Sequence, residues 1–206
     1  MKLSDFPVIP VAVVKNAERA DALGAALVEG GLPVVEVTLR TPGAVDVIRR
    51  MATNPGLLVG AGTVLTPAQV EASAKAGARF IVSPGFSQAV VDRARDLGLT
   101  VLPGAVTPTE IMAALDAGLT TCKFFPAHVY GGAAAIKALG GPFGAMRFVP
   151  TGGITAANLA DYLALPNVVS VGGSWMVPAD AVDAGDFAFV REQARAAVAL
   201  ARSLEA

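Results

Sequence analysis

The stretch Val34-Val35-Glu36-Val37-Thr38-Leu39-Arg40-Thr41-Pro42 (VVEVTLRTP) contains the repeating structural unit of this chain. Its β-branched residues predict a strand over Val34–Thr38, because such side chains fit a pleated, half-buried surface. Thr41 followed by Pro42 is typical of a helix start, with a hydroxyl at the N-cap and proline at the first helical position. The stretch therefore predicts a strand that leads through a short loop into a helix.

The same unit recurs eight times, as β-rich runs that alternate with alanine-rich stretches of helical spacing. The expected strands are Val8–Val14, Val34–Thr38, Leu57–Ala61, Phe80–Ser83, Thr100–Leu102, Thr121–Phe125, Arg147–Val149 and Val168–Val171. Further threonine–proline pairs mark helix starts, and glycines mark helix ends where a left-handed residue is needed. The pairs are Thr66–Pro67 and Thr107–Pro108, and the glycines are Gly30, Gly77, Gly98 and Gly118.

Eight βα units in 206 residues leave about 26 residues for each unit, which favours a compact α/β fold, the (β/α)₈ TIM barrel. An open flavodoxin-like sheet with extra units is the alternative. No linker or low-complexity tract interrupts the pattern, so we expect a single barrel domain over residues 1–206.

Composition restricts the partners of this chain. It is 53% hydrophobic and 16% charged with a net charge of −1, so it has no basic field for nucleic acid or an anionic membrane. No apolar run is long and unbroken enough for a membrane span, and nothing resembles a signal peptide. The single cysteine, Cys122, fits a reducing cytoplasm, and the single histidine, His128, leaves no transition-metal site. Small molecules or copies of the chain are the expected partners.

Lys123 lies among apolar neighbours in Thr121-Cys122-Lys123-Phe124-Phe125. Because side chains alternate across a strand, Lys123 and Phe125 should share one face, and Glu36 should likewise point into the barrel. Burial disfavours the charged form of an amine, and a neutral lysine near a carboxylate can attack a carbonyl and exchange protons. The structural alternatives are an ion pair that only fixes the core, or an amine that reaches solvent.

Glycines and hydroxyls follow three of the expected strands, at the end where barrel enzymes carry their sites. The third strand leads into Gly60-Ala61-Gly62-Thr63, the seventh into Thr151-Gly152-Gly153 and the eighth into Gly172-Gly173-Ser174. Paired glycines let backbone N–H groups approach an anion closely, and the last two loops often bind phosphate. The pattern predicts a phosphorylated ligand, although ordinary turns also use glycine. Trp175 is interpreted as a packing or oligomer residue, and Arg147, at the opposite end, as structural.

Six motifs, in order over nearly the whole chain, resemble the bacterial 2-keto-3-deoxy-6-phosphogluconate (KDPG) aldolase family. They are EVTLRT (36–41), GAGTVL (60–65), SPG (83–85), KFFPA (123–127), PTGGI (150–154) and GGSW (172–175). The resemblance implies a class I aldolase, a homotrimer of (β/α)₈ barrels that needs no cofactor. Its implied reaction cleaves KDPG to pyruvate and glyceraldehyde 3-phosphate, and some members also cleave 4-hydroxy-2-oxoglutarate.

The resemblance also implies roles for individual residues. Lys123 would form the Schiff base and Glu36 would transfer protons through a water. The other implied site residues are Arg40 and Thr63 for the pyruvyl carboxylate, Pro84 and Phe125 as pocket walls, and Thr151, Gly152, Gly153, Gly173, Ser174 and Lys15 for phosphate. His128, Val129 and Tyr130 depart from the family pattern and leave the contacts at the pocket rim open.

Three alternatives remain open from the sequence. A sister aldolase for the galactonate epimer would use the same lysine and glutamate, and Thr151 favours the gluconate substrate only modestly. A phosphate-binding isomerase or epimerase would use the glycine pairs but leave Lys123 without a role. A non-catalytic barrel that binds a phosphometabolite would need the Lys123–Glu36 pair only for structure.

Overall fold

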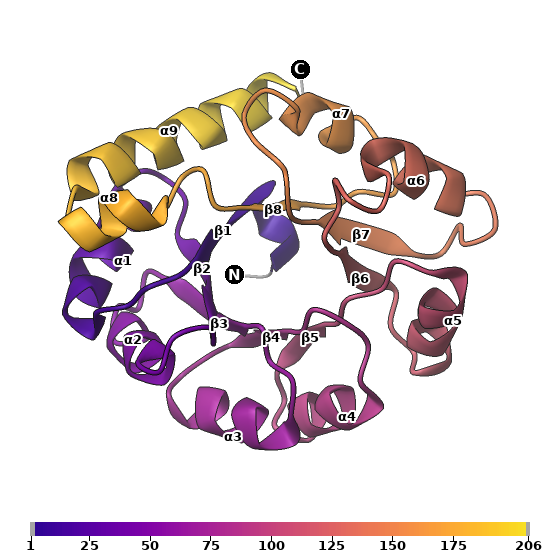
Figure 1. Ribbon diagram of the computed structural model, residues 1–206, viewed down its shortest axis with the longest axis horizontal. Coiled ribbons are helices and arrows are strands. Elements are labelled where there is room, and N and C mark those ends of the chain that lie inside the picture. Colours follow the sequence, from indigo (N-terminus) through magenta and orange to yellow (C-terminus); the bar gives the residue numbers. More distant parts are fainter. Residues whose placement is uncertain (1–2, 205–206) are drawn as a thin grey trace.

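The computed structural model describes residues 3–204, and within them eight parallel strands form a closed ring with helices outside it (Figure 1). The strands are β1 (Val8–Ala12), β2 (Val34–Thr38), β3 (Leu58–Gly62), β4 (Phe80–Val82), β5 (Thr100–Leu102), β6 (Thr121–Phe124), β7 (Arg147–Pro150) and β8 (Val171–Gly173). Six strands pair continuously in the order β5-β4-β3-β2-β1-β8, and β6 pairs with β7. Isolated bridges from Gly104 to Lys123 and from Thr151 to Gly172 join the two sheets. The predicted (β/α)₈ barrel is confirmed.

Helices follow the strands and cover the outside of the ring (Figure 1). They are α1 (Ala20–Glu29), α2 (Ala44–Met51), α3 (Pro67–Lys75), α4 (Gln88–Asp96), α5 (Pro108–Asp116), α6 (Gly132–Leu139), α7 (Leu159–Leu163), α8 (Ala179–Ala184) and α9 (Phe187–Ser203). Two 3₁₀ helices, η1 (Leu3–Asp5) and η2 (Ala17–Arg19), precede β1 and α1. Among residues 3–204, no helix is long and apolar enough to cross a membrane.

The threonine–proline pairs start two of the three predicted helices. Thr66 and Thr107 each cap a helix through the side-chain oxygen, and each forms a capping box with the residue three positions later. The prediction for Thr41 is wrong, because α2 begins after Gly43 and the Thr41 hydroxyl donates instead to the Val14 carbonyl at 2.8 Å. Gly43, two residues after Thr41, takes the N-cap position and makes no side-chain cap hydrogen bond.

Three of the four helix-end glycines have the left-handed conformation that was predicted. Gly77, Gly98 and Gly118 have φ values of 101°, 68° and 72°. Gly30 is an exception, because its φ is −75° and the next residue, Gly31, takes the left-handed position at 78°. The glycine pair shifts the turn by one residue.

Strand bounds differ most at β1 and β8. β1 ends at Ala12 rather than Val14, and β8 covers Val171–Gly173 rather than Val168–Val171. Gly172 and Gly173 pair with Ile9 and Pro10 of β1, which no side-chain pattern indicates because the pairing uses backbone groups. All five residues of both β2 and β3 are buried, as expected of parallel strands covered by helices.

Candidate active site

Lys123 and Glu36 form a buried ion pair inside the barrel. The Lys123 Nζ atom lies 3.0 Å from Oε1 and 3.2 Å from Oε2 of Glu36, and the two side chains are only 6% and 4% exposed. Their strands, β6 and β2, are four places apart in the ring of eight, so the pair spans the barrel interior. The Nζ atom also lies 5.1 Å from the centre of the Phe125 ring. At this separation a proton can pass directly between amine and carboxylate.

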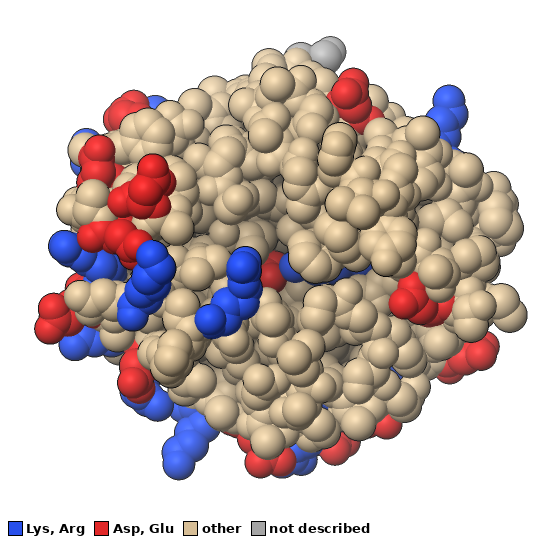
Figure 2. Space-filling view, in the orientation of Figure 1, with Lys and Arg blue, Asp and Glu red and all other residues tan. Residues whose placement is uncertain are grey.

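A cavity of about 310 Å³ opens beside this pair. It is lined by the ion pair together with Val11, Thr38, Arg40, Thr63, Pro84, Phe125 and Thr151. The four residues that the resemblance implied around a pyruvyl group are thus brought together by four different βα loops or strands. Figure 2 shows a hollow at the centre of one face of the molecule, with acidic and basic atoms visible inside it.

Arg40 carries a free positive charge at the wall of this cavity. It follows β2, and within residues 3–204 its guanidinium makes no hydrogen bond or ion pair. It lines both the smaller cavity and a larger one described below. An unpaired guanidinium that faces a pocket is well shaped to bind a carboxylate through two parallel hydrogen bonds.

Thr63, directly after β3, has a backbone conformation that its residue type rarely adopts. Its φ is 57°, and every other residue with positive φ in the described chain is glycine. A non-glycine residue in this region costs on the order of 1 kcal/mol and persists only where the surrounding structure enforces it. In this conformation Thr63 lines the same cavity as Arg40.

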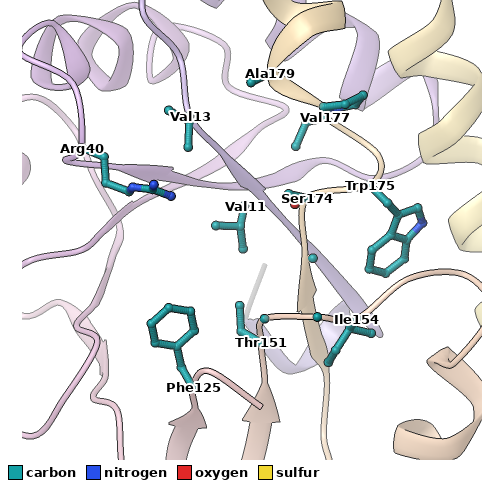
Figure 3. A pocket seen from close by; sticks show the side chains of 14 residues that line it. Val11, Val13, Arg40, Phe125, Thr151, Ile154, Ser174, Trp175, Val177 and Ala179 are labelled. Carbon is teal, nitrogen blue, oxygen red and sulfur yellow. The ribbon is translucent and has the colours of Figure 1, made fainter. Parts of the chain in front are cut away.

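The larger cavity, about 510 Å³, lies next to the smaller one and shares Val11, Arg40, Phe125 and Thr151 with it. Its wall includes five of the six residues predicted to bind phosphate, namely Thr151, Gly152, Gly153, Gly173 and Ser174. Figure 3 shows Arg40 across this cavity from Trp175 and Ile154, with Thr151 and Phe125 along its lower edge. The site is therefore two adjoining chambers, with the ion pair in one and the glycine loops in the other.

The loop after β7 presents backbone donors to the larger cavity. Gly152 and Gly153 have φ values of 96° and 76°, a left-handed succession that glycine adopts without strain. In the part of the chain that the structure describes, the Gly153 backbone N–H donates no hydrogen bond. Unused N–H groups at a cavity wall are suitable donors for an anion.

Lys15 is the one predicted phosphate residue that lines neither cavity. Its side chain is 65% exposed and forms an ion pair with Asp183 of α8. The geometry therefore gives no support to the phosphate role predicted for Lys15.

Several cavity residues were not identified from the sequence. Thr38 lies two positions after Glu36, so strand alternation could have placed it on the same inward face; its hydroxyl donates to the Ala12 carbonyl at 3.1 Å. Trp175 lines the larger cavity and was interpreted only as a packing or oligomer residue. Ile154 and Val177 have apolar side chains in loops, and no sequence pattern distinguishes them from core residues.

Cys122 and Arg147 have the structural positions that the sequence indicated. Cys122 is fully buried, and burial, with the charge of Glu110, raises the pKa of its thiol to about 12. Arg147 donates to the carbonyls of Gly144 and Met146 at the start of β7. Tyr130 is 50% exposed. Among the described residues, no group of three or more His, Cys, Asp or Glu side chains could hold a metal ion.

Known proteins resemble this chain over almost its whole length. The family model described as "KDPG and KHG aldolase" matches residues 1–193. The chain belongs to this aldolase family. It is 49% identical over 197 residues to the KHG/KDPG aldolase of Escherichia coli, covering 95% of this chain and 92% of the relative.

Solved structures of this aldolase family have the same fold. A KDPG aldolase from Legionella pneumophila, with pyruvate captured as a covalent carbinolamine intermediate, superposes with a TM-score of 0.91 at 42% identity and 94% coverage of both chains. A KDPG aldolase from Zymomonas mobilis with 3-phosphoglycerate gives a TM-score of 0.86 at 42% identity, covering 93% of this chain and 91% of the other.

Proposed function

We propose that this protein is a class I aldolase that reversibly cleaves 2-keto-3-deoxy-6-phosphogluconate to pyruvate and glyceraldehyde 3-phosphate through a Schiff base on Lys123. The observation that carries the proposal is the buried Lys123–Glu36 contact of 3.0 Å at a cavity wall that also holds the free Arg40. Family membership and the carbinolamine captured in the Legionella pneumophila relative support the same chemistry.

The reaction begins when Lys123 passes a proton to Glu36 and the neutral amine attacks C2 of the substrate. The resulting carbinolamine accepts a proton from Glu36 and loses water, which leaves a protonated imine. Arg40 and Thr63 hold the carboxylate at C1, and Pro84 and Phe125 exclude water from the imine. The positive nitrogen then serves as the electron sink for bond cleavage.

Cleavage follows when Glu36, directly or through a water, removes the proton from the C4 hydroxyl. The C3–C4 bond breaks, its electron pair moves towards the imine nitrogen, and glyceraldehyde 3-phosphate leaves. The enamine that remains is protonated at C3, and water hydrolyses the imine to release pyruvate and regenerate Lys123. Each step needs one group to give or take a proton, which a carboxylate in contact with the amine can do.

The phosphate would occupy the larger cavity, bound by Thr151, Ser174 and the backbone N–H group of Gly153, with Gly152 and Gly173 on the cavity wall. These contacts are remote from the breaking bond, so their binding energy positions C4 relative to Glu36. An unphosphorylated substrate should therefore lose turnover as well as affinity. Equal turnover with both substrates would contradict this assignment.

The decisive test is reduction by borohydride in the presence of pyruvate, followed by peptide mapping. The proposal predicts a stable carboxyethyl adduct on Lys123, and the Lys123→Met variant should acquire none. A matched control, Lys137→Met, alters an exposed lysine and should leave the adduct on Lys123 unchanged. Absence of an adduct would favour the isomerase or the non-catalytic phosphometabolite-binding barrel.

A second substrate, 4-hydroxy-2-oxoglutarate, is favoured by the family description and by the name of the Escherichia coli relative. Its second carboxylate would take the place of the phosphate in the larger cavity. Measured cleavage rates for this compound, KDPG and the galactonate epimer at C4 would rank the three substrates.

We propose in addition that the 206 residues form one aldolase domain that assembles as a homotrimer in the cytoplasm. Family resemblance supports the trimer, and the lone, buried Cys122 fits a reducing compartment. Light scattering coupled to size-exclusion chromatography would give the mass of the assembly.

A further inference from the structure

Gly62, the last residue of β3, lies against the carboxylate of Glu36. If this glycine carried a Cβ atom, that atom would lie 2.2 Å from Oε1, 2.6 Å from Cγ and 2.7 Å from Cδ of Glu36. These three atoms are its nearest neighbours, and all belong to one side chain. The Glu36 carboxylate, which transfers protons in the proposed mechanism, therefore fills the space beside the Gly62 Cα.

The requirement for glycine at this position is one of space and not of backbone conformation. Gly62 is absent from the described residues with positive φ, so an alanine could adopt its backbone angles. It pairs with Thr38 of β2, two positions after Glu36, so the carboxylate crosses from its own strand towards the neighbouring one. A methyl group here would compete directly with the carboxylate.

We propose that Gly62 is a positioning residue for proton transfer, because the volume left by its missing side chain holds the Glu36 carboxylate against the Lys123 amine. The inference rests on the proposed function of the pair. On the other side of the carboxylate, the Lys123 Nζ contacts both oxygens at 3.0 and 3.2 Å. Glu36 is thus held between the backbone of β3 and the amine of β6.

Gly62→Ala should impair proton transfer but leave imine formation on Lys123 intact. Lys123 belongs to β6, which pairs with β7 and not with β3, so its amine remains available. The carboxylate must move by about 1 Å, and a misplacement of this size can lower a rate about a hundredfold. We expect Gly62→Ala to lower kcat by ten- to a hundredfold with KM changed less than threefold, and to keep the borohydride-trapped pyruvate adduct.

A stability cycle tests this placement without relying on activity. Gly62→Ala is made in the natural protein and in a Lys123→Met/Glu36→Ala background, which removes the carboxylate without leaving a buried charge unpaired. In the natural protein the variant should lower Tm by roughly 5 °C, the usual cost of overpacking in a chain of this size. In the pair-free background the shift should fall to less than half.

Gly60→Ala provides a matched control on the same strand. The Cβ atom of an alanine there would lie 2.2 to 2.4 Å from ring atoms of Phe80, so its cost should be the same in both backgrounds. If Gly62→Ala lowers Tm equally in both backgrounds, or leaves kcat unchanged, the positioning role is overturned. A failure of the proposed function gives a different result: Glu36→Gln would then keep full turnover, whatever the Tm values of the Gly62 variants.

Discussion

Replacing Lys123 with methionine should destabilise the barrel as well as stop catalysis. Methionine has a similar length but no charge, so the Glu36 carboxylate, only 4% exposed, loses the amine 3.0 Å away. Removal of one partner from a buried ion pair typically costs about 3 to 5 kcal/mol, because the remaining charge is desolvated without compensation. For a chain of 206 residues this corresponds to a decrease in Tm of roughly 10 °C.

The double variant Lys123→Met/Glu36→Leu separates stability from function. With both charges replaced by apolar groups of similar size, the free energy of unfolding should return to within about 1 kcal/mol of the natural value, or exceed it. Aldolase activity should stay absent in both variants.

Urea denaturation, followed by circular dichroism at constant pH, gives the free energies of unfolding of the three proteins. A Lys123→Met variant within about 1 kcal/mol of the natural protein would refute the reasoning, because it would show that Glu36 does not depend on the amine. A double variant as unstable as the single one would refute it too, since the cost would then come from lost packing.

The remaining predictions concern other parts of the site and fold. Because burial and the charge of Glu110 raise the Cys122 pKa to about 12, iodoacetamide at pH 8 should label this thiol only after unfolding, as mass spectrometry would show. Thr107→Ala removes the N-cap of α5 and should cost about 1 kcal/mol in urea titrations. Burial acts to raise the pKa of Glu110, but hydrogen bonds from two backbone N–H groups and the Thr107 hydroxyl lower this pKa overall. Ionised Glu110 therefore stabilises the fold at neutral pH, and this contribution is lost below about pH 4. Thr107→Ala should reduce this dependence of stability on acid pH. Arg40→Met should raise KM for pyruvate in the condensation direction by at least tenfold, whereas Lys15→Ala should change it less than twofold.

The predicted parts of this structure depend on local patterns. Threonine before proline started α3 and α5 because a cap is made within four residues of chain. The same pair at Thr41 does not start a helix: α2 begins after Gly43, and the Thr41 hydroxyl donates to the Val14 carbonyl, 27 residues away. Distant partners of this kind are not visible in a local pattern.

The features of the site also divide into those that a local sequence pattern predicts and those that depend on the folded chain. Strand alternation placed Glu36 and Lys123 inside the barrel, and the order of the glycine loops placed the expected phosphate residues at one end. The direct contact of Glu36 with Lys123, the pairing of Lys15 with Asp183 and the position of Trp175 on the cavity wall required the folded chain.

Helix caps and strand alternation act over a few neighbouring residues, so the amino-acid sequence could predict eight βα units and the inward direction of Glu36 and Lys123. Which of these residues meet depends on the closed ring of strands. Glu36 and Lys123 are 87 positions apart, and closure of the ring brings their strands to opposite sides of one narrow interior. There a glycine on β3 leaves room for the carboxylate, and that complementarity depends on three strands at once.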